Sequence, residues 1–155
     1  MLDKPQIIRT EARNTAVIHL IVPREEIQDV MGPAIDEVLA VIQAQGLSPD
    51  GPMFSYHLRR PTDTFDFEVG FPVAKQVPEA GRVKAGQLPA ARVARTIYHG
   101  GYENLGAAWG DFLAWIEASG FVQREDLWEC YISGPESSPD SATWNTELNR
   151  PLDAD

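Results

Sequence analysis

The chain has 155 residues, of which 43% are hydrophobic and 23% charged, and its formal net charge is −10. This length and composition are typical of one globular domain, and so acidic a chain is expected to repel nucleic-acid phosphates and anionic membrane surfaces. The single cysteine, Cys130, excludes an internal disulfide and any zinc site built on paired cysteines. Since the sequence shows neither a membrane-spanning apolar run nor a signal-like N-terminus, we expect a cytoplasmic protein that binds neither DNA nor membranes by itself.

The first half of the sequence predicts the order strand, helix, strand, strand. Residues 16–22 form an apolar, β-branched run closed by Pro23, which indicates a buried strand. Acidic residues then open a helical pattern, whose apolar positions recur every three or four residues until Gly46 ends it. Two further strands are predicted over residues 53–58 and 65–73, on either side of a polar turn.

The second half predicts the same order again. A strand over residues 91–99 precedes a helix that ends at Gly120, and strands over 127–133 and 142–149 follow, separated by a turn-rich loop. The apolar face of this second helix consists of Leu105, Trp109, Phe112 and Ile116.

Matching residues in the two halves indicate an internal duplication. The matched pairs are Gly46 with Gly120, Tyr56 with Tyr131, Glu68 with Glu147 and Pro72 with Pro151. The spacing is 74 residues for the first pair, 75 for the second and 79 for the last two. Most of this increase falls in the second hairpin loop, where insertions are readily tolerated.

We therefore expect an α+β fold, with one domain over residues 1–155. In this domain the first repeat covers about residues 6–73 and the second repeat about residues 90–152. A connector of about residues 74–89 joins them. Two β-α-β-β units related by a pseudo-twofold axis place their strands in one antiparallel sheet and both helices on one face. This arrangement leaves a central cleft between the helices, where a small-molecule pocket with aromatic walls is expected.

The second repeat also carries an ordered set of short motifs. They are His99-Gly100-Gly101-Tyr102-Glu103-Asn104-Leu105, Ala108-Trp109, Trp115-Ile116, Gly120-Phe121, Trp128-Glu129-Cys130-Tyr131, Thr146-Glu147-Leu148 and Pro151-Leu152. The set resembles the GyrI-like small-molecule-binding family, which includes effector-binding domains of AraC-type and MerR-type multidrug regulators. The resemblance extends over essentially the whole chain and implies a cleft for amphipathic, often cationic or aromatic, ligands. Gly101 departs from the pattern because many relatives carry proline there, and no helix-turn-helix segment is present, which indicates a standalone member.

Two glutamates are candidates for the charge in this cleft. Glu147 matches the acidic position of the family's Thr-Glu-Leu motif, so the resemblance implies a carboxylate that faces the cleft and neutralises a cation. The alternative is an exposed strand glutamate that only aids solubility. Glu68 is its counterpart in the first repeat, on the opposite side of its strand from Phe65 and Phe67. Glu68 is therefore solvated if the helices cover the aromatic face, and lines the groove with Glu147 if they do not.

Aromatic side chains are the expected walls of the cleft, because ring faces attract cations within about 6 Å. The alternative for each ring is ordinary core packing. The candidate residues are Tyr56, Tyr131, Trp109, Tyr102, Phe54 and Trp144.

Other chemistries find little support in the sequence. His19, His57 and His99 lie on separate predicted strands without the spacing of metal ligands. The chain contains neither a Gly-x-Ser-x-Gly nucleophile motif nor a glycine-rich phosphate loop. Glu129 next to Cys130 disfavours a reactive thiolate. We therefore expect no metal and no cofactor.

These observations favour a binding protein over an enzyme. The predicted function is binding of an amphipathic aromatic or cationic small molecule between the two repeats, for sequestration or effector sensing. One alternative is a metal-independent hydrolase of cyclopropanoid or other strained electrophiles, an activity that the resemblance also implies, with Glu147 activating water. A second alternative is a protein inhibitor or partner-binding module that uses the acidic surface.

Overall fold

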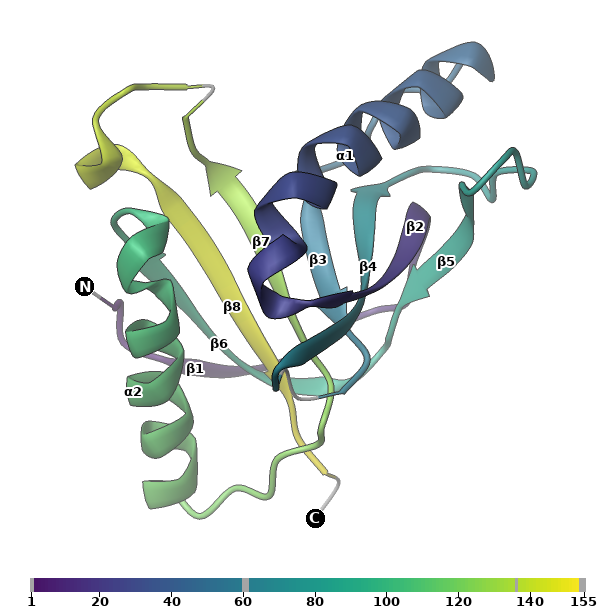
Figure 1. Cartoon of the computed structure of the whole chain (residues 1–155). Helices are drawn as coiled ribbons and strands as arrows, with labels where there is room; N and C mark the ends of the chain where they lie inside the picture. The colour runs from purple at the N-terminus through teal and green to yellow at the C-terminus, as the bar shows by residue number, and fades with distance from the viewer. Residues whose placement is uncertain (1, 60–61, 136, 154–155) are drawn as a thin grey trace.

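The computed structural model describes residues 2–59, 62–135 and 137–153, and in this part of the chain it shows an eight-stranded antiparallel sheet with two helices on one face (Figure 1). The predicted α+β architecture is confirmed. The helices are α1 (Ile27–Ala44) and α2 (Leu105–Ala118). The strands are β1 (Gln6–Arg9), β2 (Arg13–Pro23), β3 (Phe54–His57), β4 (Thr64–Pro72), β5 (Lys84–Leu88), β6 (Arg92–His99), β7 (Leu127–Ser133) and β8 (Asn145–Pro151).

Six of these strands form two β-α-β-β units, β2-α1-β3-β4 and β6-α2-β7-β8. The strand order of the sheet is β1-β6-β8-β7-β3-β4-β2-β5, so the units meet at the β7–β3 pair and run outward from it in the same order. At this junction Ser55 lies directly opposite Glu129. The two units therefore share one sheet, as the repeated pattern predicts.

Two edge strands extend this arrangement beyond the predicted elements. β5 lies within the segment expected to be a connector and pairs with the first half of β2, which starts at Arg13 instead of residue 16. β1 precedes the first unit in sequence but pairs with β6 of the second. The last strand starts at Asn145 instead of residue 142, because a 3₁₀ turn (Ser141–Thr143) capped by the Asp140 carboxylate precedes it.

The helices cover the same face but pack on different halves of the sheet, as Figure 1 shows. Val38 and Ile42 of α1 pack with Phe67, whereas Phe112 and Ile116 of α2 belong to a separate cluster. A third cluster, formed by Val17, Phe54, Leu88, Val93 and Trp128, lies on the face of the sheet away from the helices. Each helix therefore has its own apolar core on the sheet.

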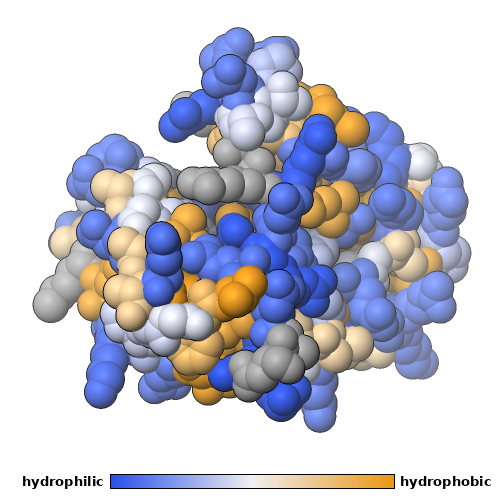
Figure 2. Space-filling view, turned by 90° about the horizontal axis from the view of Figure 1, so that it is seen from below, coloured by the Kyte–Doolittle hydropathy of each residue, from blue (hydrophilic) through white to orange (hydrophobic). Residues whose placement is uncertain are grey.

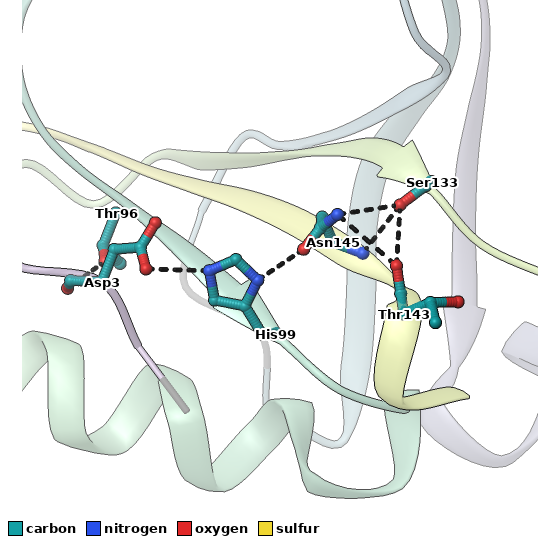
Figure 3. Close-up of polar contacts among 6 residues, drawn as sticks. All are labelled: Asp3, Thr96, His99, Ser133, Thr143 and Asn145. Atoms are coloured by element: carbon teal, nitrogen blue, oxygen red, sulfur yellow. Dashed lines mark hydrogen bonds and ion pairs between the residues drawn. The ribbon is translucent and has the colours of Figure 1, made fainter. Parts of the chain in front are cut away.

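The N-terminal segment is tied to the sheet edge by a network around His99 (Figure 3). The His99 Nε2 atom lies 2.8 Å from Asp3 Oδ1, and Nδ1 contacts Asn145 Oδ1. The Asn145 amide nitrogen donates to the Thr143 carbonyl, so its oxygen faces the histidine. The Thr96 hydroxyl donates to the Asp3 carbonyl at 2.7 Å. The two ring nitrogens of His99 thus connect the N-terminal segment to the start of β8.

One face of the molecule shows how polar and apolar residues are distributed on the surface. Seen from below, hydrophilic residues dominate, and hydrophobic residues gather in small patches between them (Figure 2). Among the described residues, neither helix is long and apolar enough to cross a membrane.

Candidate functional site

A cavity of about 580 Å³ lies between the two helices, above the junction of the two units. Ile27 and Met31 of α1 form one wall, and Leu105, Trp109 and Leu113 of α2 form the opposite wall. Each helix presents these residues on one face because they recur at intervals of four residues. The walls of the cavity are therefore mainly apolar.

Three strands form the floor of the cavity. Strand residues two positions apart share a face, so β3, β4 and β7 each present alternate side chains to the helices. The floor residues are Ser55 and His57 of β3, Phe65 and Phe67 of β4, and Leu127, Glu129 and Tyr131 of β7. The aromatic face of β4 is thus the covered face, and the opposite side of that strand faces away from the cavity.

Glu129 provides a buried carboxylate at this floor, with a residue exposure of 9%. The Trp109 Nε1 atom donates to its Oε1 at 2.6 Å, and the Tyr131 hydroxyl donates to its Oε2 at 2.9 Å. Burial raises the pKa of Glu129, while these two hydrogen bonds act in the opposite direction. Both partners are neutral donors, so they hold the carboxylate in place without neutralising its charge.

A chain of hydrogen bonds continues from Glu129 across the floor. The Tyr131 hydroxyl lies 2.8 Å from Ser55 Oγ, which lies 3.4 Å from His57 Nε2. The His57 ring stacks on Phe67 with a centroid distance of 5.1 Å, and its Nδ1 atom has no hydrogen-bond partner among the described residues. Burial lowers the pKa of His57 to about 4 and raises the pKa of Tyr131. Both side chains are therefore neutral at pH 7.

Three of the six aromatic residues expected at the cleft line this cavity. They are Trp109, Tyr131 and Tyr102. The Tyr102 ring meets Tyr131 edge-on at 6.1 Å and lies 5.1 Å from the Trp144 ring. Trp144 does not line the cavity. Its indole N–H donates to the Ser138 carbonyl, and its ring packs against Tyr102.

The structure places Phe54 and Tyr56 on the opposite face of the sheet. Phe54 is buried in the third core cluster. The Tyr56 hydroxyl donates to Asp126 at 2.7 Å, and its ring contacts Trp128 edge-on at 5.9 Å. Neither residue reaches the cavity, because both alternate with the inward-facing Ser55 and His57 along β3.

Glu147 and Glu68 also lie on that opposite face, contrary to the expected role in the cleft. The Glu147 Oε1 atom lies 3.3 Å from Arg95 Nε and accepts a hydrogen bond from Asn149. Glu68 lies 3.7 Å from Lys84 Nζ. Their equivalence in the repeat is real, since they occupy matching register positions, but both carboxylates have cationic partners away from the cavity.

A one-residue offset in the alignment of the repeats explains why Tyr131 lines the cavity and Tyr56 does not. Tyr56 pairs with Glu68, and Cys130 pairs with Glu147, so Tyr56 corresponds to Cys130 and not to Tyr131. An offset of one residue moves a side chain to the other face of a sheet. The spacing of 74 residues between Gly46 and Gly120 carries the correct register and relates Ser55 to Glu129.

Reactive-thiol and metal chemistry remain without support here. Burial, followed by the nearby Glu147 carboxylate, raises the pKa of Cys130 to about 12. Within residues 2–59, 62–135 and 137–153, no three His, Cys, Asp or Glu side chains are grouped so that they could hold a metal ion.

The sequence matches a family model described as "GyrI-like small molecule binding domain" over residues 3–153. The crystal structure of the EcmrR C-terminal domain is similar to this chain, with 23% identity, a TM-score of 0.83 and coverage of 98% of both chains. The longer EcmrR chain in a complex with DNA is 22% identical, with a TM-score of 0.82; the match covers 98% of this chain but only 58% of that one.

Two more distant structures share the fold. One is SAV2435 bound to tetraphenylphosphonium, with 9% identity, a TM-score of 0.71 and coverage of 98% of this chain and 95% of that chain. The other is described as a hydrolase from Listeria innocua, with 13% identity, a TM-score of 0.67 and coverage of 97% and 92%. Among curated protein sequences, none matches this chain significantly.

Proposed function

The chain belongs to the GyrI-like family of small-molecule binding domains, and we propose that it binds a lipophilic aromatic cation in the cavity between α1 and α2. The observation that carries this proposal is the buried carboxylate of Glu129, held by Trp109 and Tyr131 at the floor of a mainly apolar cavity. A buried charge with neutral partners is costly when the cavity is empty, and a cationic ligand offsets that cost.

The aromatic lining supports the same class of ligand. Trp109, Tyr131 and Tyr102 present rings around the carboxylate. A cation over such a ring gains roughly 0.5–2 kcal/mol, depending on how far it is desolvated. A delocalised or quaternary cation suits this site better than a small hydrated one, because it loses less hydration energy on entering an apolar cavity.

Tetraphenylphosphonium is a suitable probe, since a relative of the same fold was crystallised with it. In this chain the phosphonium centre would lie near Glu129 and its phenyl groups against the aromatic walls. The biological role would be sequestration of such a compound or sensing it as an effector. The similarity to a domain of a longer DNA-bound chain favours sensing, which would require a partner or further domain to read the signal.

The test is a titration of the protein with tetraphenylphosphonium, followed by calorimetry and tryptophan fluorescence. Glu129→Gln should weaken binding about tenfold or more, because it removes the buried counter-charge. Glu147→Gln is the matched control and should change affinity less than about twofold, because that carboxylate lies on the other face of the sheet. Equal effects of the two substitutions would contradict the proposal.

A second candidate, hydrolysis of a strained electrophile, is favoured by the same carboxylate. Burial raises the pKa of Glu129 and so makes its carboxylate more basic, and the Tyr131 hydroxyl beside it supplies a proton donor. The hydrolase description of the Listeria innocua relative makes this candidate worth testing. Incubation with a cyclopropane-bearing electrophile and mass analysis distinguishes the two functions: product beyond one equivalent of protein indicates catalysis.

A further inference from the structure

Arg24 places a cationic side chain at the mouth of the cavity whose floor holds Glu129. It lies in the 3₁₀ turn Arg24–Glu26 just before α1 and lines both the cavity and an adjoining surface hollow. Arg24 is exposed, whereas Glu129 is buried. The guanidinium therefore marks the outer end of the cavity, and the carboxylate marks its inner end.

The guanidinium of Arg24 has no ion-pair or hydrogen-bond partner among the described residues. Its backbone is held, because the Arg24 N–H donates to the Asp63 carbonyl at 2.8 Å. The neighbouring carboxylate of Glu25 lines the adjoining hollow but not the cavity itself. Arg24 is thus anchored at its base while its charged end is open to a ligand.

The other described lining residues add no further charge to the cavity. Glu129 and Arg24 are the charged side chains of the described lining, and His57 is neutral at pH 7. A ligand with only a cationic centre would satisfy Glu129 and leave Arg24 unused.

We propose that the cavity selects aromatic cations that also carry a carboxylate on the side opposite the cationic centre, and that Arg24 binds this carboxylate. The proposal rests on the proposed function, in which Glu129 binds the cationic centre. A planar guanidinium donates two parallel hydrogen bonds to a carboxylate, which fixes the orientation of the ligand as well as its charge. Because the protein has a net charge of −10, a carboxylate elsewhere on its surface would be repelled.

The experiment compares two probes of nearly the same shape, (4-carboxyphenyl)triphenylphosphonium and its methyl ester. Affinities for both are measured by calorimetry with the wild-type protein, Arg24→Gln and the control Arg82→Gln. Arg82 is an exposed arginine paired with Glu37 away from the cavity, so its removal makes the same change in net charge. Thermal melts verify that the variants are folded.

The wild-type protein should bind the carboxylate probe more tightly, relative to the ester, than Arg24→Gln does. We expect the ratio of the two affinities to fall about three- to fivefold in Arg24→Gln, the magnitude of a partly exposed ion pair, and to stay unchanged in Arg82→Gln. Raising the ionic strength should reduce the wild-type ratio as well, because the mouth is exposed to solvent.

Other outcomes separate the two proposals. If both probes bind and Arg24→Gln leaves the ratio of affinities at the wild-type value, the role of Arg24 is overturned while the cation site stands. If neither probe nor tetraphenylphosphonium binds the wild-type protein, the proposed function fails, and the role of Arg24 fails with it.

Discussion

Glu129 and Glu147 lie on neighbouring strands of one sheet and point to opposite faces. Glu129 is directly opposite Leu148, and Glu147 is directly opposite Cys130. The first carboxylate is buried with neutral donors under the helices, and the second is paired with Arg95. Two acidic residues in adjacent motifs therefore have different chemistry, and only Glu129 is placed to act on a ligand in the cavity.

The affinity for tetraphenylphosphonium should depend on pH through Glu129. Burial raises the pKa of this carboxyl, so it is protonated, and unable to attract a cation, at pH values where an ordinary glutamate is already ionised. Affinity should therefore rise as the pH increases through this raised pKa, and binding near it should release protons. Calorimetry in buffers of different ionisation enthalpy measures the proton release. Affinity that does not change with pH through the acidic and neutral range would contradict this role.

The same burial predicts that Glu129→Gln stabilises the empty protein at neutral pH. A raised folded-state pKa contributes stability that is fully present below the ordinary glutamate pKa and is lost as the pH rises through the raised value. Replacing the buried carboxylate by a neutral amide should thus increase the free energy of unfolding at pH 7, even though the amide can accept only one of the two hydrogen bonds from Trp109 and Tyr131. Denaturant unfolding measures this gain, and it should disappear in acid. A variant that is less stable than the wild type at both pH values would show that the carboxylate supports the fold.

His57 should make the protein sensitive to acid. Burial lowers its pKa from the ordinary histidine value of 6.5 to about 4, so protons bind the unfolded chain more readily than the folded one. Stability should therefore be full above about pH 6.5 and decline toward pH 4, with a loss of about 2 kcal/mol at pH 5. His57→Phe keeps a flat ring against Phe67 and should remove this part of the decline. Identical slopes of stability against pH in the two proteins would exclude His57 as the cause.

The contact between His99 and Asp3 should hold the N-terminal segment on the sheet. Asp3→Ala removes the acceptor of His99 Nε2 while leaving the contact of the ring with Asn145. We expect amide exchange in β1 to accelerate about fivefold, the effect of losing about 1 kcal/mol of local stability, while β3 and β7 keep their protection. Hydrogen exchange followed by mass spectrometry measures this difference. Unchanged exchange in β1 would mean that its pairing with β6 suffices to hold the segment.

Much of the fold could be predicted because its signals are local. Alternating apolar runs and helical periodicity predict both β-α-β-β units, and the segment 127–133 matches β7 in full. The sequence pattern does not predict β5, because Lys84–Leu88 includes a glycine and has no β-branched residue. It is a strand because β2 offers a free edge beside it, a condition set by distant parts of the chain.

The architecture, the acidic character and the aromatic content of this protein could be predicted, since they follow from composition and short-range periodicity. The face of each strand that the helices cover could not, and it is this face that brings Glu129, Ser55 and His57 to the cavity while Glu147 and Tyr56 lie on the other side. Side chains alternate between faces at every residue, so the choice depends on the hydrogen-bonded register between strands that are far apart in sequence. A pattern that matches residues to within one position cannot specify that register.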